Sequence, residues 1–168
     1  MIAGGDQVLN KTITMEDLRI LDVCRDIELL NEQLYRYFSD LFLENGELAM
    51  LWKKTANEEA NHAQQFELAI RHKNEMLESV SLNACSADTA FKYVCTLLEI
   101  VKSSPPSVTE SLQLAVKLEE RLTRLHLECI ASFTEESHKK LFRAMMAQDN
   151  YHIETILEAQ KKYSKTMH

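Results

Sequence analysis

The sequence predicts an all-α protein, organised as a bundle of four long helices. Three glycines and two prolines among 168 residues leave little to interrupt helices, and no run alternates apolar and polar residues convincingly over the length of a strand. Hydrophobic residues make up 45% of the chain, which is enough for one core. We therefore expect a single domain that spans residues 1–168.

Two long helices joined by a tight turn are expected in the first half of the chain. Thr14 can cap the first helix, because Asp17 three positions later resembles the acid of a capping box. This helix should run to about Glu44, where the Asn-Gly pair at 45–46 marks a turn. A second long helix should then continue to about Ser79.

A long connector separates this hairpin from the second half of the chain. The small and polar residues at 81–87 predict a loop, and Asp88 can cap a shorter helix that ends near Lys102. The Ser-Ser-Pro-Pro stretch at 103–106 then breaks the chain, because proline cannot continue a helix.

Two further long helices are expected to complete the chain. The third begins near Ser107 or Thr109 and runs to about Ser132. After a turn near Thr134, the last helix continues to about Tyr163. Two hairpins of long helices, joined by a long crossover that contains a short extra helix, are typical of a ferritin-like four-helix bundle.

Each long helix carries an acid on the stripe of residues that should face the core. The first and third helices each place a lone glutamate there, and the second and fourth each place an acid three positions before a histidine, so that both lie on one helix face. The separation from lone acid to paired acid is 31 residues in the first hairpin and 30 in the second. The residues are Glu28, Glu119, Glu59 with His62, and Asp149 with His152.

Buried acids in this number predict a metal site with two ions. Burying unpaired carboxylates is costly, whereas four negative charges balance two divalent cations. Imidazole and carboxylate suit iron or manganese, and the absence of thiolates from the set disfavours structural zinc. The four cysteines have no Cys-x-x-Cys spacing and are expected to be reduced thiols packed in the helices.

A further acid-x-x-His pair, Glu135 with His138, is interpreted differently. It lies at the start of the last helix, where an acid stabilises the positive end of the helix dipole. Glu59→Ala should therefore lose most bound metal, whereas Glu135→Ala should change nothing.

This pattern resembles the ferritin-like di-iron carboxylate proteins, and in particular the rubrerythrin branch. The resemblance covers residues 15–163 and is specific at the six ligand positions. The resemblance implies that Glu28 and His62 are terminal ligands of one iron and that Glu119 and His152 are terminal ligands of the other. It also implies that Glu59 and Asp149 bridge the two irons.

Three features depart from the rubrerythrin pattern. Asp149 stands where a glutamate is expected and is shorter by one C–C bond of about 1.5 Å. Leu122 occupies the place of an additional glutamate, and Glu120 points about 100° away and cannot substitute. No Cys-rich rubredoxin-like domain follows, so a separate electron donor is expected. These departures leave the predicted metal site intact but argue against a rubrerythrin-type peroxidase cycle.

The leading functional hypothesis is an oxidoreductase of the peroxidase or ferroxidase type. Two ferrous ions about 3.5–4 Å apart could react with O2 or hydrogen peroxide. The alternative is a non-enzymatic metal-binding bundle with little turnover, and a third interpretation is a helical interaction module with a vestigial site.

Three further residues near the predicted ligands have open roles. Tyr35 resembles the tyrosine near the metals in rubrerythrins and could relay protons or electrons, or it could be a hydrogen-bonded core tyrosine. His126 is expected to support a ligand or to pack in the core rather than bind metal. Cys24 could be oxidised by nearby peroxide, although inert packing is the simpler interpretation.

The net charge and the N-terminal residues predict which partners and which cellular location to expect. A net charge of −7 with no basic run argues against nucleic-acid binding. No apolar segment approaches the length of a membrane span, and the first residues lack the features of a signal peptide, so a cytoplasmic location is expected. The long crossover would obstruct packing into a storage shell, which makes a homodimer the expected assembly.

Overall fold

Five helices make up the part of the chain that the computed structural model describes, residues 13–72, 83–130 and 136–165. They are α1 (Met15–Leu41), α2 (Gly46–Arg71), α4 (Ala84–Ser103), α5 (Val108–Ile130) and α6 (Glu136–Lys165). Those residues contain no strand, and the predicted all-α class is confirmed.

The first hairpin begins with the predicted capping box. The Thr14 hydroxyl accepts a hydrogen bond from the Asp17 amide at 3.1 Å, and the Asp17 carboxylate accepts one from the Thr14 amide at 2.8 Å. The Asn45 side chain caps α2 by accepting from the Leu48 amide at 3.2 Å, which fixes the turn predicted at 45–46. The stretch from 73 to Ser79, predicted to be helical, lies outside the described residues.

The connector helix α4 is longer than predicted and begins earlier. Its cap is Asn83, whose side chain accepts from the Cys85 amide at 2.8 Å, and not Asp88. Asp88 instead lies within the helix and forms an ion pair with Arg19 of α1 at 3.1 Å. The 20 residues of α4 extend over about 30 Å, at 1.5 Å per residue. The crossover is therefore a helix nearly as long as α5.

The second hairpin follows the proline break. Ser107 and Glu110 form a capping box at the start of α5, in which the Glu110 carboxylate accepts from the Ser107 amide at 2.8 Å and the Ser107 hydroxyl accepts from the Glu110 amide at 3.3 Å. The turn predicted near Thr134 lies outside the described residues, as does Glu135, and nothing about the side chain of His138 is described.

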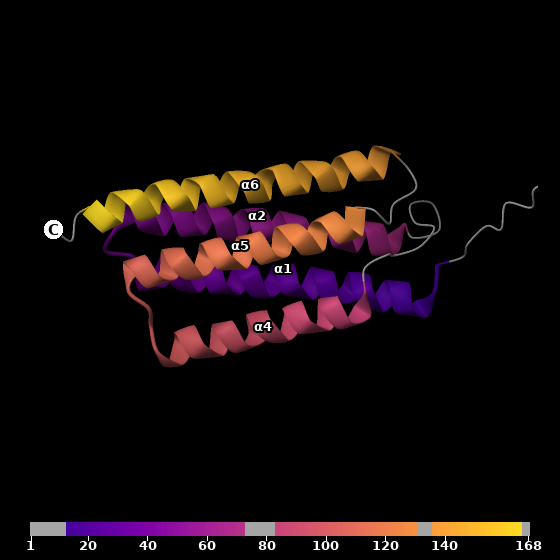
Figure 1. Cartoon of the computed structure of the whole chain (residues 1–168), viewed down its shortest axis with the longest axis horizontal. Coiled ribbons are helices and arrows are strands. Elements are labelled where there is room, and N and C mark those ends of the chain that lie inside the picture. The colour runs from indigo at the N-terminus through magenta and orange to yellow at the C-terminus, as the bar shows by residue number, and fades with distance from the viewer. Residues whose placement is uncertain (1–12, 73–82, 131–135, 166–168) are drawn as a thin grey trace, which may run out of the picture.

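The helices form two antiparallel hairpins, α1 with α2 and α5 with α6, linked by α4 (Figure 1). Helices α1, α4 and α6 run in one direction, whereas α2 and α5 run in the other. Because α2 and α5 are parallel, the connection between them must return along the whole bundle, and α4 does so while packing against α1 and α5. The predicted bundle with a long crossover is confirmed.

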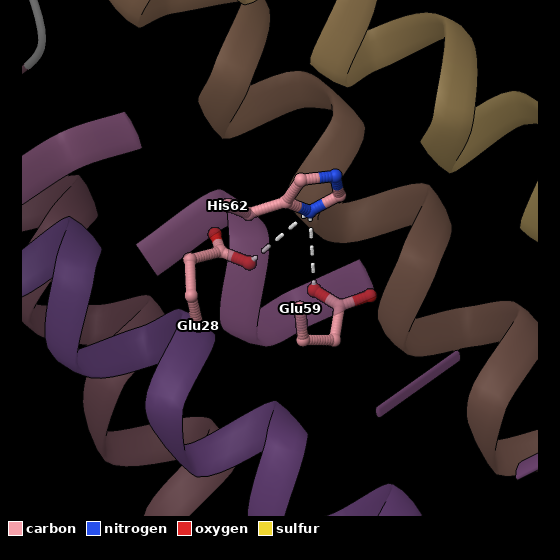
Figure 2. A group of neighbouring side chains, drawn as sticks. All are labelled: Glu28, Glu59 and His62. Carbon is pink, nitrogen blue, oxygen red and sulfur yellow. Dashed lines mark ion pairs between the residues drawn. The ribbon is translucent and has the colours of Figure 1, made fainter. Parts of the chain in front are cut away.

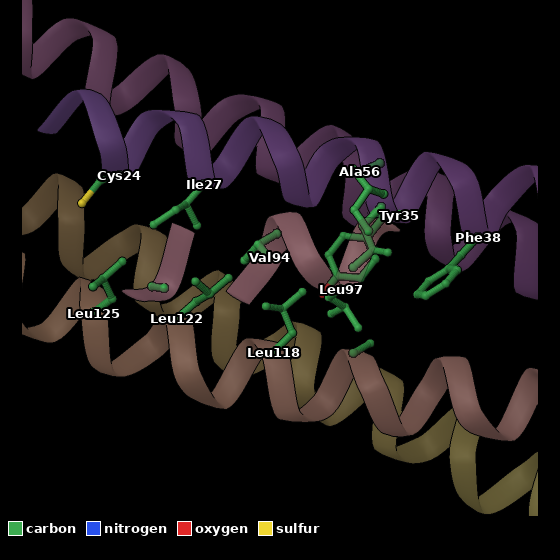
Figure 3. Packing of buried hydrophobic residues seen from close by; sticks show 14 of the residues in the cluster. Cys24, Ile27, Tyr35, Phe38, Ala56, Val94, Leu97, Leu118, Leu122 and Leu125 are labelled. Atoms are coloured by element: carbon green, nitrogen blue, oxygen red, sulfur yellow. The ribbon is translucent and has the colours of Figure 1, made fainter. Parts of the chain in front are cut away.

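The core has an apolar part and a polar layer. Ile27 of α1, Leu97 of α4 and Leu118 of α5 belong to one cluster of buried side chains (Figure 3). Beside them Tyr35 stacks on Trp52, with ring centroids 5.6 Å apart. The polar layer interrupts this packing near the middle of the bundle, where Glu28, Glu59 and Glu119 are all buried.

The outer faces of the helices are mostly polar. The large hydrophobic side chains that remain exposed include Met15, Leu43 and Met50. Among the helices that the structure describes, none combines the length and the apolar character needed to cross a membrane.

Candidate metal centre

Three carboxylates and three imidazoles form the polar layer, and four helices supply them. Each of these residues is at most 2% exposed. They are Glu28 of α1, Glu59 and His62 of α2, Glu119 and His126 of α5, and His152 of α6.

One group of possible ligands, here called position A, consists of Glu28, Glu59 and His62. The His62 Nδ1 atom lies 3.8 Å from Glu28 Oε2 and 3.4 Å from Glu59 Oε2. Figure 2 shows the imidazole facing both carboxylates, one from each helix of the first hairpin. The three ligand atoms lie within 4.8 Å of one another, so one cation could contact all of them.

A second group, position B, consists of Glu59, Glu119 and His152, again with ligand atoms within 4.8 Å. The His152 Nδ1 atom lies 3.4 Å from Glu59 Oε1. Glu59 therefore belongs to both positions, and it presents a different oxygen to each imidazole: Oε2 to His62 and Oε1 to His152. This is the arrangement expected of a carboxylate that spans two ions.

Of the six predicted ligands, the structure brings five together. Asp149 lies in α6, three positions before His152, but its side chain is outside the described residues. Its bridging role therefore stays a prediction.

The two lone glutamates are each held by a side chain from the opposite hairpin. Tyr35 of α1 donates its hydroxyl proton to Glu119 Oε1, and His126 of α5 lies with Nε2 2.7 Å from Glu28 Oε1. Tyr35 and His126 each stand seven residues after the lone glutamate of their own helix. One oxygen of Glu28 is thus held by His126, while the other, Oε2, is the oxygen nearer to His62 in position A.

Several buried polar atoms at the centre make no hydrogen bond to any of the described residues. Glu28 Oε2, Glu59 Oε1 and His152 Nδ1 have no hydrogen-bond partner in the part of the chain that the structure describes. An unsatisfied buried polar atom costs free energy. Two of these atoms are carboxylate oxygens and the third is an imidazole nitrogen, so the donor set fits a cation.

The pKa values in the layer reflect a balance between burial and ion pairing. Burial would raise the pKa of Glu28, but His126 and His62 outweigh it and lower this pKa to about 2. Burial would lower the pKa of His62, but the neighbouring Glu28 and Glu59 carboxylates outweigh it and raise this pKa to about 11. The pKa of His152 is raised to about 9, because Glu59 and its neighbouring carboxylates outweigh burial.

We expect the metal-free protein to be most stable between about pH 4.5 and 6.5. The lowered pKa of Glu28 contributes stability that is lost as the pH falls from 4.5 through about 2. The raised pKa values of His62 and His152 contribute stability that is lost as the pH rises from 6.5 through about 9 and 11. Urea unfolding of metal-free protein across this range should show the maximum, and a curve that rises steadily above pH 7 would contradict these charges.

Tyr35→Phe should destabilise the metal-free protein by about 1–3 kcal/mol, because Glu119 Oε1 would lose its donor while staying buried. Chemical unfolding measures this difference. Tyr37→Phe is a matched control, since the Tyr37 hydroxyl donates to the Val101 carbonyl away from the layer. Equal losses in both variants would show that the contact with Glu119 is not special.

One residue of the site was not predicted from the sequence. Glu58, beside Glu59 on α2, has its Oε2 atom 2.5 Å from His152 Nε2. It lies off the apolar stripe, and its side chain is 18% exposed, so the periodicity that identified the other residues passes over it. Only the packing of α2 against α6 brings it to the histidine.

The fold and the site together define a ferritin-like helical bundle with carboxylate and histidine groups that could hold metal ions. A crystal structure from Thermotoga maritima, of a protein described as a candidate ferritin-like diiron-carboxylate protein, superposes with a TM-score of 0.67 and 21% sequence identity. The match covers 89% of this chain and 97% of that chain. No family model matches the chain, and no curated protein matches it.

Proposed function

We propose that the protein binds two iron ions at positions A and B and reacts with O2 or hydrogen peroxide as an oxidoreductase related to rubrerythrins. The observation that carries the proposal is Glu59, whose two oxygens each face the Nδ1 atom of a different histidine. Glu28 of α1 completes position A, and Glu119 of α5 completes position B.

The residues of the chain would divide the work as follows. Glu28 and His62 would hold an ion at position A, Glu119 and His152 would hold an ion at position B, and Glu59 and Asp149 would contact both ions. Bound iron would supply two electrons for reduction of the oxidant. Every described ligand is buried, which excludes bulk water from the site. Only small oxidants such as O2 or hydrogen peroxide could therefore reach the ions.

Tyr35 and His126 keep the two lone glutamates in place. Each bonds one carboxylate oxygen, and the second oxygen of Glu28 is the one nearer to His62 in position A. The buried Tyr35 hydroxyl donates its proton to Glu119, and we assign it a role as a proton or electron relay. Manganese is the alternative metal, because the donor set contains only imidazole and carboxylate groups.

A second candidate function is metal binding with little turnover. Leu122, buried one turn after Glu119, offers no additional ligand on α5, so this position adds no negative charge to the centre. Under either function we expect a homodimer in the cytoplasm, and turnover would require a separate electron donor.

Anaerobic loading with ferrous iron tests the proposal. We expect two irons per chain and, on adding O2 or peroxide, a new near-ultraviolet absorption that marks oxidation of both irons to the ferric state. Repeated re-oxidation in the presence of a reductant would support the enzyme, whereas a single re-oxidation would support the binding protein. One iron or none would overturn the dinuclear site.

A further inference from the structure

Glu58 contacts His152, the histidine of position B, at the ring nitrogen that does not face that position. Its Oε2 atom lies 2.5 Å from His152 Nε2, while His152 Nδ1 lies 3.4 Å from Glu59 Oε1 and is the ligand atom facing position B. Lys54, one turn earlier on α2, lies 4.0 Å from the other Glu58 oxygen. The Glu58 carboxylate is thus held between a surface lysine and a buried imidazole.

This contact determines which nitrogen of His152 can bind a metal. An ionised carboxylate only accepts hydrogen bonds, so the proton of the neutral imidazole must sit on Nε2 when Glu58 accepts from it. The lone pair of Nδ1 then faces position B. A carboxylate behind a ligating histidine both orients the ring and raises its basicity.

The sequence position in the last helix that corresponds to Glu58 holds an uncharged residue. The residue before Asp149, which corresponds to Glu58 before Glu59, is the uncharged Gln148. In addition, Glu28 of position A shares its charge with the His126 imidazole at 2.7 Å, whereas Glu119 of position B accepts from a neutral phenol. The two positions are therefore chemically unequal.

We infer that Glu58 is a positioning residue for His152 and that it makes position B the tighter of the two metal sites, filled first. This inference rests on the proposed dinuclear site. It goes beyond the site itself, because it concerns the order and relative affinity of the two ions.

Titration of metal-free protein with Co²⁺, followed by visible absorption and calorimetry, tests the inference. We expect two binding steps in the wild-type protein. In Glu58→Ala the tighter step should weaken about 10- to 100-fold, the usual effect of removing such a supporting group. Glu58→Gln should weaken it less, because the amide oxygen still accepts from Nε2. Glu67 is an exposed acid of the same helix that pairs with Arg71. Glu67→Ala should leave both binding steps unchanged.

Two paired backgrounds separate positioning from a general structural effect. In Glu28→Ala, which disables position A, adding Glu58→Ala should weaken the remaining site. In Glu119→Ala, which disables position B, adding Glu58→Ala should have no effect on the remaining site. A merely structural role of Glu58 would lower the affinity in both backgrounds.

The outcomes distinguish this inference from the proposed function. A wild-type protein that binds two Co²⁺ ions, with a Glu58→Ala titration that superposes on it, would overturn the inference alone. Loss of affinity in both backgrounds would also overturn it. A wild-type protein that takes up no metal would overturn the proposed function and this inference together.

Discussion

Glu59→Ala is expected to lose most of the metal from both positions at once. Glu59 is the residue shared by the two groups of possible ligands, and its two oxygens face two different imidazoles. Alanine therefore removes one ligand from each ion and also the negative charge between the ions. The metal content measured after ferrous loading should fall from two ions per chain to less than one.

Single-position variants make this expectation specific. Glu28→Ala and Glu119→Ala should each retain about one ion, because each removes a ligand from one position only. Glu67→Ala, a surface acid on the same helix as Glu59, should retain both. If Glu59→Ala kept one firmly bound ion, the carboxylate would belong to a single position and the bridging assignment would be wrong.

Most of the fold and the centre of the site could be predicted from the helical periodicity of the sequence. Thr14, Asn45 and Ser107 cap helices where the pattern predicted starts or turns, because capping uses side chains within a few residues. The buried acids were visible for a similar local reason: a charged residue on an apolar stripe contradicts the period. Glu28 and Glu59 are such exceptions, and both are buried.

Features set by packing between helices were not predictable in the same way. Glu58 meets His152, 94 residues away, only because α2 lies against α6. The contact of His126 with Glu28 spans 98 residues and crosses from one hairpin to the other. The early start of α4 was missed for another reason, since a connector of small residues has no strong period and the Asn83 cap lies within it.

The double variant Glu59→Leu with His62→Leu should stabilise the metal-free protein, by about 1–4 kcal/mol. Leucine resembles both side chains in volume, and replacing a buried ion pair by apolar residues removes its desolvation cost. Every remaining charge of the described layer keeps a partner in this variant. Glu28 keeps His126, Glu119 keeps Tyr35, and His152 keeps Glu58.

His62→Leu alone should have the opposite effect and cost about 3–5 kcal/mol, because Glu59 stays buried after losing the imidazole that lies 3.4 Å from its Oε2 atom. Urea unfolding of the metal-free variants measures both differences. Metal should then reverse the order, since it stabilises the wild-type protein by binding and cannot stabilise the double variant. A double variant as unstable as His62→Leu would show that the layer contributes to folding by itself. A more stable double variant would show that the chain keeps a costly group of buried charges for the sake of the metal.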